Sequence, residues 1–279
     1  MFTLTSGNKK LLLNSPKVMG ILNVTPDSFS DGGKYSQFEL ACQHADEMIA
    51  AGVDFIDIGG ESTRPGAADV SEQQELDRVV PLVEYVVRNS DVWISVDTSK
   101  AAVMRESIAS GAHLINDVRS LTEPGALDVV VKAQVPVCIM HMQGQPKTMQ
   151  HDPQYQDVVA EVLQYCQQRT AECVAAGLTK EQVIVDPGFG FGKTLAHNYR
   201  LLAELNRFSE LNQPLLIGLS RKSMIGNLLQ RPVEQRLAGS LAGAMLAAQQ
   251  GAHIIRVHDV NETIDVLRVL AETQAAASS

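Results

Sequence analysis

The sequence repeats one pattern eight times: a short apolar run ends at a polar residue, and a loop or a helical segment follows. The runs are spaced by about 30 residues on average, which is typical of parallel strands joined by helical crossovers. Residues 19–33 (MGILNVTPDSFSDGG) show the pattern first, because the apolar run stops at Asn23 and a polar, glycine-rich loop begins. The predicted strands cover residues 18–23, 55–58, 93–97, 113–117, 135–141, 183–186, 214–220 and 253–258.

The segments between these strands carry helical signals, namely apolar residues at helical spacing with capping residues before them and glycine after them. Ser71 is expected to cap the second helix, and Thr98 or Ser99 the third. Residues 4–15 predict two short strands around a Gly-Asn turn, which would cover the N-terminal end of a barrel. The predicted helices cover residues 38–51, 72–88, 98–110, a short segment from 123, 157–176, 197–211, 222–250 with a break at 231–232, and a last helix through 273.

A closed (β/α)8 barrel of the TIM type, with parallel strands and a short N-terminal β-hairpin, is the simplest α/β architecture for this order of elements. It would form one domain over residues 1–279, because such barrels reach about 250 residues as a single domain. The alternative is a doubly wound open sheet. That fold usually places a glycine fingerprint at its first strand–helix turn, and the residues that follow Asn23 contain none.

Composition excludes several classes of partner. A formal net charge of −9 disfavours binding to nucleic acid or to an anionic membrane. Four cysteines without a C-x-x-C pair argue against a zinc site or a disulfide framework and favour reduced thiols; they are Cys42, Cys138, Cys166 and Cys173. The sequence shows no signal-peptide pattern and no apolar run of 18 residues, so we expect a cytoplasmic protein without a membrane span.

If the barrel forms, the polar residues that end its strands meet at one mouth. Asp97, Asn116 and Asp186 offer carboxylate and amide groups, which suit a flat heterocycle with ring N–H and amino donors. Each of them could instead cap a helix or hold a loop. The residues expected at the mouth are Asn23, Asp57, Asp97, Asn116, His141, Asp186, Ser220, Arg221, Lys222, Arg256 and His258.

A second group of candidates is cationic, in a chain that is otherwise acidic: Arg64, Arg221, Lys222, Arg256 and His258. Such a set suits an anionic ligand, most simply phosphate or diphosphate. Residues 220–222 also lie where the seventh strand enters a helix, so backbone N–H groups and the helix dipole would favour an anion there. Surface salt bridges to Asp or Glu are the alternative role for these side chains.

Residues 188–194 (GFGFGKT) resemble a nucleotide P-loop, but that motif needs four residues between its first glycine and Gly-Lys, and here there are three. The glycines also lack the spacing of a dinucleotide fingerprint. We therefore interpret the segment as a mobile active-site loop with Phe189 or Phe191 available to cover a ligand. His141 and His258 lack the spacing of a metal site, and the loops after the first two strands are candidate lids.

Residues 19–33 and 57–66 (DIGGESTRPG) resemble the two signatures of bacterial dihydropteroate synthases. Residues 95–98 (SVDT), 116–117 (ND), 186–193 (DPGFGFGK), 220–223 (SRKS) and 256–258 (RVH) resemble the remaining motifs in the same order. The resemblance covers nearly the whole chain. It implies a TIM barrel that joins 6-hydroxymethyl-7,8-dihydropterin diphosphate to p-aminobenzoate and releases diphosphate and 7,8-dihydropteroate, a step of tetrahydrofolate biosynthesis.

The resemblance also implies the roles of individual residues, a Mg²⁺ cofactor, a homodimer and competition by sulfonamides. The pterin is expected to contact Asp97, Asn116, Asp186, Lys222 and Arg256. The diphosphate is expected at Asn23, Thr63, Arg256 and His258, with Asn23 also reaching the metal. p-Aminobenzoate is expected near Thr63, Arg64, Pro65, Phe191, Ser220 and Ser223. The catalytic residues would be Lys222, Arg256, Asp97 and Arg64.

Two other functions remain open at this stage. Pterin-binding barrels of the corrinoid methyltransferase type use a similar pocket, but they would not need the cationic residues at 220–222 and 256–258. A pterin-binding protein without catalytic activity should have lost Asp27, Arg64 or Lys222, and all three are present.

Overall fold

The computed structural model describes residues 1–24, 34–62, 69–144, 149 and 152–277. In this part of the chain, eight parallel strands are hydrogen-bonded in the order β8-β7-β6-β5-β4-β3-β10-β9, and a parallel bridge between Val185 and Leu215 joins the two outer strands. The predicted barrel is therefore confirmed. Its strands are β3 (Lys17–Asn23), β4 (Phe55–Gly59), β5 (Trp93–Asp97), β6 (Leu114–Asp117), β7 (Val137–Met140), β8 (Val183–Asp186), β9 (Leu216–Ile217) and β10 (Ile254–Val257).

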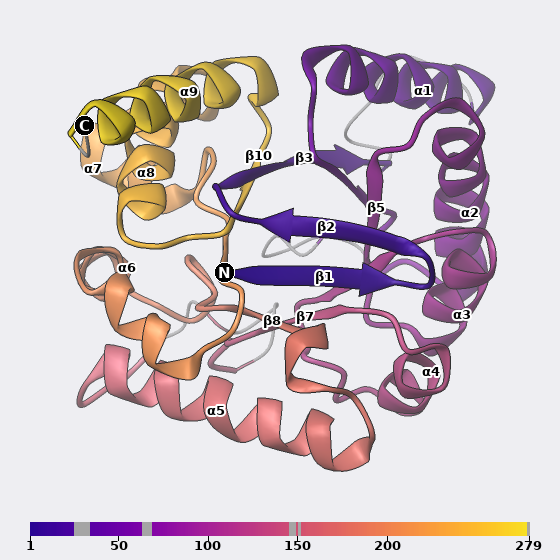
Figure 1. The fold of residues 1–279 in the computed structure, drawn as a ribbon, viewed down its shortest axis with the longest axis horizontal. Coiled ribbons are helices and arrows are strands. Elements are labelled where there is room, and N and C mark those ends of the chain that lie inside the picture. The colour runs from indigo at the N-terminus through magenta and orange to yellow at the C-terminus, as the bar shows by residue number, and fades with distance from the viewer. Residues whose placement is uncertain (25–33, 63–68, 145–148, 150–151, 278–279) are drawn as a thin grey trace.

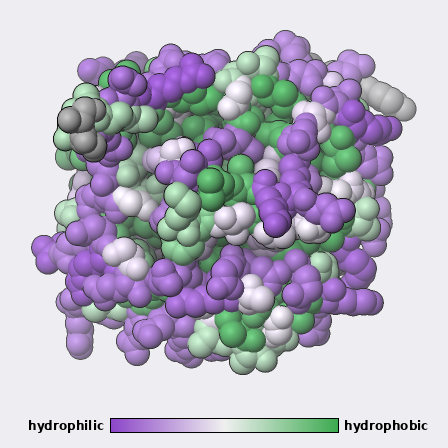
Figure 2. Space-filling view, viewed as in Figure 1, coloured by the Kyte–Doolittle hydropathy of each residue, from purple (hydrophilic) through white to green (hydrophobic). Residues whose placement is uncertain are grey.

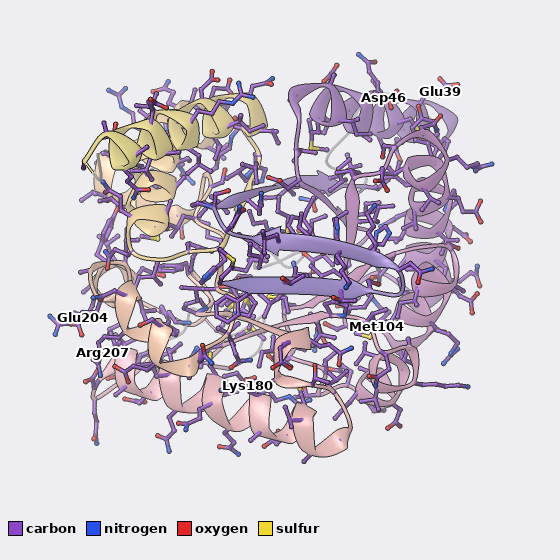
Figure 3. All side chains as sticks on the ribbon, in the orientation of Figure 1. Glu39, Asp46, Met104, Lys180, Glu204 and Arg207 are labelled. Carbon is purple, nitrogen blue, oxygen red and sulfur yellow. The ribbon has the colours of Figure 1, made fainter. Side chains whose placement is uncertain are left out.

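Helices surround the strands, as Figure 1 shows, and charged side chains such as Glu39, Asp46, Glu204 and Arg207 lie on this outer ring (Figure 3). The α-helices are α1 (Lys34–Ala51), α2 (Glu72–Asn89), α3 (Ala101–Ala109), α4 (Ala126–Ala133), α5 (Val158–Ala176), α6 (Leu195–Ala203), α7 (Ser223–Leu229), α8 (Leu237–Gln249) and α9 (Val260–Ala277). Short 3₁₀ segments are η2 (Lys180–Gln182), η3 (Leu205–Leu211) and η4 (Val233–Gln235). None of the described helices has both the length and the apolar character that crossing a membrane requires.

Two predicted helices are divided in the structure. The helix expected over 197–211 is α6 followed by η3, because Leu205, Phe208 and Leu211 are buried at a spacing of three, which is the period of a 3₁₀ helix. The stretch expected over 222–250 is α7, η4 and α8, so the break at Pro232 is confirmed but is wider than predicted.

The predicted caps were right for one helix and wrong for another. Ser71 caps α2, and its hydroxyl accepts the backbone N–H of Gln74. At α3 the residue before the first turn is Lys100, and its side chain makes no cap hydrogen bond. Ser99 does not cap this helix because its hydroxyl donates to the buried carboxylate of Asp117 instead.

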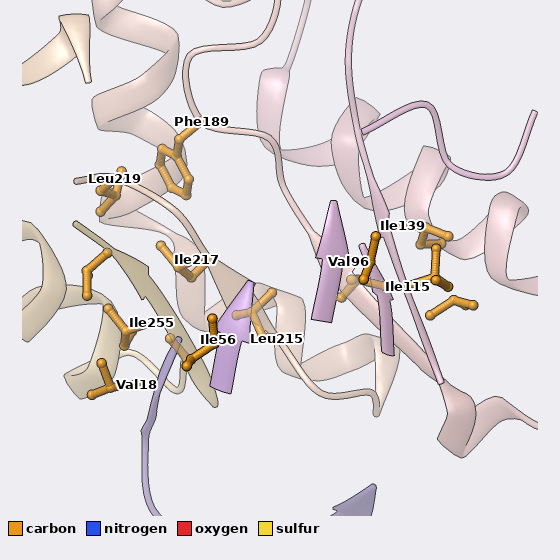
Figure 4. Close-up of a cluster of buried hydrophobic side chains, with 14 of the residues drawn as sticks. Val18, Ile56, Val96, Ile115, Ile139, Phe189, Leu215, Ile217, Leu219 and Ile255 are labelled. Atoms are coloured by element: carbon orange, nitrogen blue, oxygen red, sulfur yellow. The ribbon is translucent and has the colours of Figure 1, made fainter. Parts of the chain in front are cut away.

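The strands separate two apolar layers. Val18, Ile56, Val96, Ile115 and Ile139 face the helices and belong to the main core (Figure 4). The alternate residues of each strand face the barrel axis, because successive side chains of a strand point to opposite faces. The first layer of inward-facing residues forms a separate buried cluster that contains Met19, Phe55, Trp93, Leu114, Cys138, Ile184, Leu216 and Ile254.

The N-terminal hairpin covers this inner cluster. Strands β1 (Phe2–Ser6) and β2 (Lys9–Leu13) are antiparallel, and the turn between them begins at Gly7, which has a positive φ of 56°. Leu4 and Leu13 are buried in the inner cluster, so the hairpin closes the N-terminal end of the barrel as predicted (Figure 1). Figure 2 shows that polar side chains cover most of this face and that hydrophobic patches on it are small.

The next inward positions of the strands are mostly polar. Two residues after the apolar layer lie Asp57 on β4, Asn116 on β6, Asp186 on β8 and Arg256 on β10. Asn23, Asp97 and His258 follow at the same alternation, one step nearer the C-terminal end. The fold thus brings the candidate residues to the axis of the barrel above a closed apolar floor.

Candidate active site

A cavity of about 780 Å³ opens at the C-terminal ends of the strands. Twelve of the residues predicted for the site line it: Asn23, Asp97, Asn116, Asp186, Phe189, Phe191, Ser220, Arg221, Lys222, Ser223, Arg256 and His258. Ile21, Val118 and Met140 add apolar surface. Thr63, Arg64 and Pro65 lie outside the described residues, as does Asp27, and their predicted roles stay predictions.

Arg256 is the centre of a hydrogen-bonded network at the base of this cavity. Its Nε donates to Asp57 Oδ2 at 2.6 Å and its Nη2 donates to Asp97 Oδ2 at 2.8 Å. Asn116 Nδ2 also donates to Asp57 Oδ2, at 3.1 Å. Burial raises the pKa of Asp97 even though the guanidinium of Arg256 opposes the rise. Although burial works against its charge, the carboxylates of Asp57 and Asp97 raise the pKa of Arg256, so the guanidinium is fixed as a cation in one orientation.

Asp186 and Lys222 form a second pair of charged groups on the cavity wall. The carboxylate Oδ1 of Asp186 accepts the backbone N–H of Gly188 at 2.7 Å, which fixes the plane of the carboxylate. Lys222 Nζ donates to the carbonyl oxygen of Phe189 and lies 4.7 Å from the centre of the Phe191 ring. Burial lowers the pKa of Lys222 to about 8, and Asp186 opposes this shift. Lys222 is therefore mostly protonated at neutral pH.

The cationic set predicted to bind an anion is only partly available for that role. Ser220 Oγ lies 3.0 Å from Nδ1 of His258 and accepts the backbone N–H of His258 at 3.2 Å, which places both residues at the cavity. Arg221 lines the cavity, but its guanidinium is paired with the carboxylate of Asp259 through two hydrogen bonds. The salt-bridge alternative thus holds for Arg221. Arg256 is also ion-paired, with Asp57 and Asp97 at the base of the cavity, and both Lys222 and Arg256 line the cavity.

Two residues expected at the mouth, Asp57 and His141, have other positions, and one of the two phenylalanines expected to cover a ligand is not free to do so. Asp57 is fully buried beneath Arg256 and does not line the cavity. His141 comes one residue after the inward-facing Met140, so the strand alternation turns it outward, where its ring packs against Tyr155 and Tyr165. Phe189 also lines the cavity, but its side chain is fully buried in the core and so is not free to close over a ligand, whereas Phe191 is only half-buried there.

The loop that carries these phenylalanines is tethered at several points. Gly190 N donates to Asn198 Oδ1 at 2.7 Å, and the hydroxyl of Tyr155 donates to the carbonyl of Gly192 at 2.7 Å. Lys193 is 3% exposed and lies behind the loop. These hydrogen bonds hold the loop in place, whereas the sequence had predicted a mobile loop. Sequence analysis assigned no role to the side chain of Lys193.

Sequence reasoning also missed a charged group beside the cavity. Lys100 Nζ donates to Glu61 and to Glu75, at 2.5 Å in each case. Glu61 lines the cavity, whereas Glu75 is fully buried on α2. From the sequence alone, a glutamate in the first turn of a helix is expected to favour the helix N-terminus through its charge. Glu75 lies on the same face of α2 as the buried apolar residues of that helix. This helical spacing was the sequence signal that could have predicted a buried carboxylate at position 75.

The described residues contain no group of three or more His, Cys, Asp or Glu side chains that could hold a metal ion. Asn23 offers one amide oxygen, and Gly59 leaves room for it, since a Cβ at that position would lie 3.1 Å from Asn23 Oδ1. Mg²⁺ is commonly bound by one or two protein oxygens together with substrate phosphates and water. The residues present therefore fit Mg²⁺ only in company with the oxygens of a bound diphosphate.

Residues 19–258 match the model of a family described as pterin binding enzyme. The chain belongs to the pterin binding enzyme family. The dihydropteroate synthase of Escherichia coli (strain K12) is 60% identical over 264 residues, which cover 95% of this chain and 94% of that protein. The Haemophilus influenzae dihydropteroate synthase is 56% identical over 273 residues, which cover 98% and 99%.

Solved structures in the same family agree with the fold. The Yersinia pestis dihydropteroate synthase in a sulfonamide drug complex is 58% identical, with a TM-score of 0.94 over 98% of this chain and 100% of that one. The Xanthomonas albilineans dihydropteroate synthase with 4-aminobenzoic acid is 50% identical, with a TM-score of 0.93 over 98% of each chain. The family match spans every described residue that lines the cavity.

Proposed function

We infer that this chain is a dihydropteroate synthase, a transferase that condenses 6-hydroxymethyl-7,8-dihydropterin diphosphate with p-aminobenzoate and releases diphosphate. The observation that carries this inference is the convergence of two chemically different sets of side chains in one cavity. Asp97, Asn116 and Asp186 form the set suited to a flat heterocycle, and Lys222, Arg256 and His258 form the set suited to an anion. Relatives at 56–60% identity over nearly the whole chain carry the same name.

The pterin would lie against the carboxylate and amide set. A carboxylate can accept two parallel hydrogen bonds from the N–C–NH₂ edge of a pterin ring, in the way that it pairs with a guanidinium. Asp186 suits this role because the Gly188 N–H holds its carboxylate at a fixed angle. Arg256 is held by Asp57 and Asp97. Its planar guanidinium could therefore stack on the ring face without losing its orientation.

The diphosphate would lie towards Asn23, Arg256 and His258, with Thr63 as a further contact. When Mg²⁺ is bound with Asn23, it would supply additional positive charge for the oxygens of the leaving group. The residues of this chain supply the remaining stabilisation, because Lys222 and Arg256 are fixed cations in a largely buried site.

The reaction forms a bond between the amine nitrogen of p-aminobenzoate and the methylene carbon of the pterin, and it breaks the bond from that carbon to the diphosphate oxygen. The amine is neutral and needs little activation, so stabilising the departing anion is the main task of the site. The electron-rich pterin ring and nearby carboxylates tolerate positive charge on the methylene carbon as the leaving group departs. Lys222, Arg256, Asp97 and Arg64 are the residues that we assign to catalysis.

p-Aminobenzoate would occupy the outer part of the cavity, near Phe191, Ser220 and Ser223. We propose that Thr63, Arg64 and Pro65, which lie outside the described residues, contribute to the same subsite. Because one relative is solved with 4-aminobenzoic acid and another with a sulfonamide drug, we propose that both compounds compete for this subsite here.

We further propose that the enzyme works in the cytoplasm as a homodimer. Large apolar side chains are exposed together on α7, η4 and α8, and the small residues of α8 would allow a second copy to approach closely; the apolar residues are Leu228, Leu229, Val233, Met245 and Leu246. The four cysteines are buried free thiols, as expected in a reducing compartment.

The decisive assay follows diphosphate release in the presence of the pterin diphosphate, p-aminobenzoate and Mg²⁺. The unmodified protein should turn over, and omission of either organic substrate should stop release. Lys222→Ala and Asp186→Ala should each abolish turnover while circular dichroism shows a folded barrel, because each removes a charge that faces the reacting groups. Retained turnover in both variants would refute the assigned site.

A further inference from the structure

Lys193 lies behind the cavity and does not line it. Its Nζ donates to the carbonyl oxygens of Gly188 at 2.8 Å and Phe191 at 3.0 Å. The same nitrogen lies 2.9 Å from His141 Nδ1 and 3.3 Å from the His141 carbonyl oxygen. Burial lowers the pKa of His141 to about 3, so the ring is neutral and its Nδ1 can accept a hydrogen bond from Lys193 Nζ. All four neighbours are thus acceptors around three N–H donors.

The loop between Asp186 and Lys193 needs this donor because of its backbone shape. Gly188, Gly190 and Gly192 all have positive φ values, of 71°, 80° and 62°. A Cβ at Gly188 would lie 1.9 Å from the carbonyl oxygen of His141, and one at Gly192 would lie 2.4 Å from that of Gln143. The loop is therefore pressed against the backbone that follows β7. This path turns several carbonyl oxygens towards one buried point, where Lys193 Nζ meets them.

The opposite side of the same loop faces the cavity. The carbonyl of Phe189 accepts from Lys222 Nζ, and the Phe191 ring lies 4.7 Å from that nitrogen. Two lysines thus hold one loop from its two sides, Lys193 through Gly188 and Phe191 and Lys222 through Phe189. A shift of the Phe191 carbonyl away from Lys193 would move the aromatic ring relative to Lys222.

We propose that Lys193 is a positioning residue for the reaction, whose buried ammonium sets the Gly188–Gly192 loop so that Lys222 and Phe191 meet the two substrates in the correct place. The inference rests on the function proposed above. It assigns a role to the lysine of a motif that only superficially resembles a phosphate-binding loop, since its ammonium binds backbone carbonyls and faces away from the cavity.

If Lys193 had only a structural role, its burial would lower the stability of the fold without a compensating gain in function. Burial lowers the pKa of Lys193 to about 7, which shows that the buried charge is disfavoured where it lies. An apolar side chain could fill the space at lower cost, but it would leave the carbonyls of Gly188 and Phe191 without their donor. The N–H groups of Lys193 are what maintain the geometry of the loop.

Lys193→Met tests the proposal, because it keeps the length of the side chain and removes the donor. We expect the KM for p-aminobenzoate to rise about tenfold and kcat per folded molecule to fall about tenfold, since displacement of about 1 Å in a site can cost even more. Lys9→Met is the matched control. Lys9 Nζ also binds two carbonyl oxygens, those of Asp91 at 2.7 Å and Val92 at 3.0 Å, but at the closed end of the barrel. Lys9→Met should lower the melting temperature and leave the KM for p-aminobenzoate and kcat unchanged.

If Lys193→Met does not fold, Tyr155→Phe decides the question. It removes only the hydroxyl that donates to Gly192 of the same loop, and it should raise the KM for p-aminobenzoate about threefold. A KM within experimental error of the unmodified enzyme in the folded Lys193→Met protein, or in Tyr155→Phe where that is used, would overturn the proposal. Such a result with an active unmodified enzyme leaves the proposed function standing, whereas an inactive unmodified enzyme would refute the function itself.

Discussion

The two ends of the barrel treat polar residues in opposite ways. At the N-terminal end, Asp54, His113 and His253 each precede a strand and accept a backbone N–H from the neighbouring strand. The donors are Val18 N at 2.8 Å, Ile94 N at 3.0 Å and Leu215 N at 3.1 Å. At the C-terminal end, the inward-facing polar groups bind one another around Arg256 and face the cavity. At the N-terminal end, polar side chains accept backbone N–H groups of the sheet. At the C-terminal end, polar side chains surround a cavity that can hold a ligand.

The cost of this arrangement is visible in the buried groups. Among the described residues, Asp57 Oδ1 and Glu75 Oε1 are buried without a hydrogen-bond partner, and both carboxylates lie towards the C-terminal end; at the closed end the corresponding atom is the neutral Trp93 Nε1. Unsatisfied buried polar atoms destabilise a fold, and proteins tolerate them chiefly at functional sites. The closed end compensates with apolar burial around Leu4, Phe55 and Trp93. Stability and function are thus separated along the barrel axis, and this separation can be tested.

The largest effect is expected from Asp57→Ala. The substitution removes the partner of a buried guanidinium, which should cost about 3 to 5 kcal/mol in the free energy of unfolding. It should also lower kcat/KM at least about a hundredfold, because Arg256 loses its orientation. Urea unfolding and diphosphate release measure the two losses separately.

Asp54→Ala is the control at the closed end. It removes one hydrogen bond to Val18 N and a 3.7 Å ion pair with Lys17, so we expect a loss of about 1 kcal/mol in stability and unchanged kinetics. An equal loss of activity in both variants would mean that the two ends are not separate.

The next largest effect concerns the apolar floor. Leu4 is fully buried beneath the barrel, and Leu4→Ala should lower the free energy of unfolding by about 2 to 5 kcal/mol. Because the hairpin is remote from the cavity, kcat and both KM values should stay at their original values at a temperature where the variant is folded. A rise in either KM would show that the floor also shapes the site.

The change from apolar to polar residues along each strand also explains which features the sequence could predict. All eight strands were found, and β5 and β8 have the predicted bounds, because buried apolar runs with polar ends are a strong local signal. Strand alternation further places Asp57, Asn116, Asp186 and Arg256 on one face, since each lies two positions after an inward apolar residue. The strand ends alone had suggested His141 as well, and its outward orientation follows from the same alternation.

Other features depend on contacts that no local pattern reveals. β9 has only two residues because the chain from Gly218 onwards leaves the sheet and turns towards α7. Arg221 was expected to bind an anion, but Asp259, at the start of α9, pairs with it. The role of Lys193 depends on carbonyl oxygens from two loops, and the sequence gives no sign of which way those carbonyls point. Tertiary partners decided each of these cases.

The smallest expected effect is the share of the acid sensitivity that comes from two histidines of the closed end, in addition to any share from His141, whose pKa burial lowers to about 3. Burial lowers the pKa of His113 to about 4 and also lowers that of His253, and in each ring Nδ1 accepts a strand N–H. Both rings are therefore neutral in the folded state at a pH where an unfolded histidine begins to bind a proton. Because the unfolded state then binds more protons, stability should be complete above about pH 6.5 and should fall as the pH drops towards 4. Lys9 strengthens this shift at His113 and Asp91 opposes it.

Urea midpoints between pH 7.5 and 4.5 measure this fall. His113→Asn keeps an acceptor but cannot take up a proton, so its stability should decline less steeply than that of the unmodified protein, and adding His253→Asn should flatten the curve further. His44→Asn is the control, because His44 lies half-buried on α1, away from the barrel ends, and pairs with Glu47. Equal slopes in the unmodified protein and all three variants would show that the acid sensitivity arises elsewhere, for example at His141 behind the cavity or among the carboxylates around Arg256. The open end of the barrel would then limit stability as well as activity.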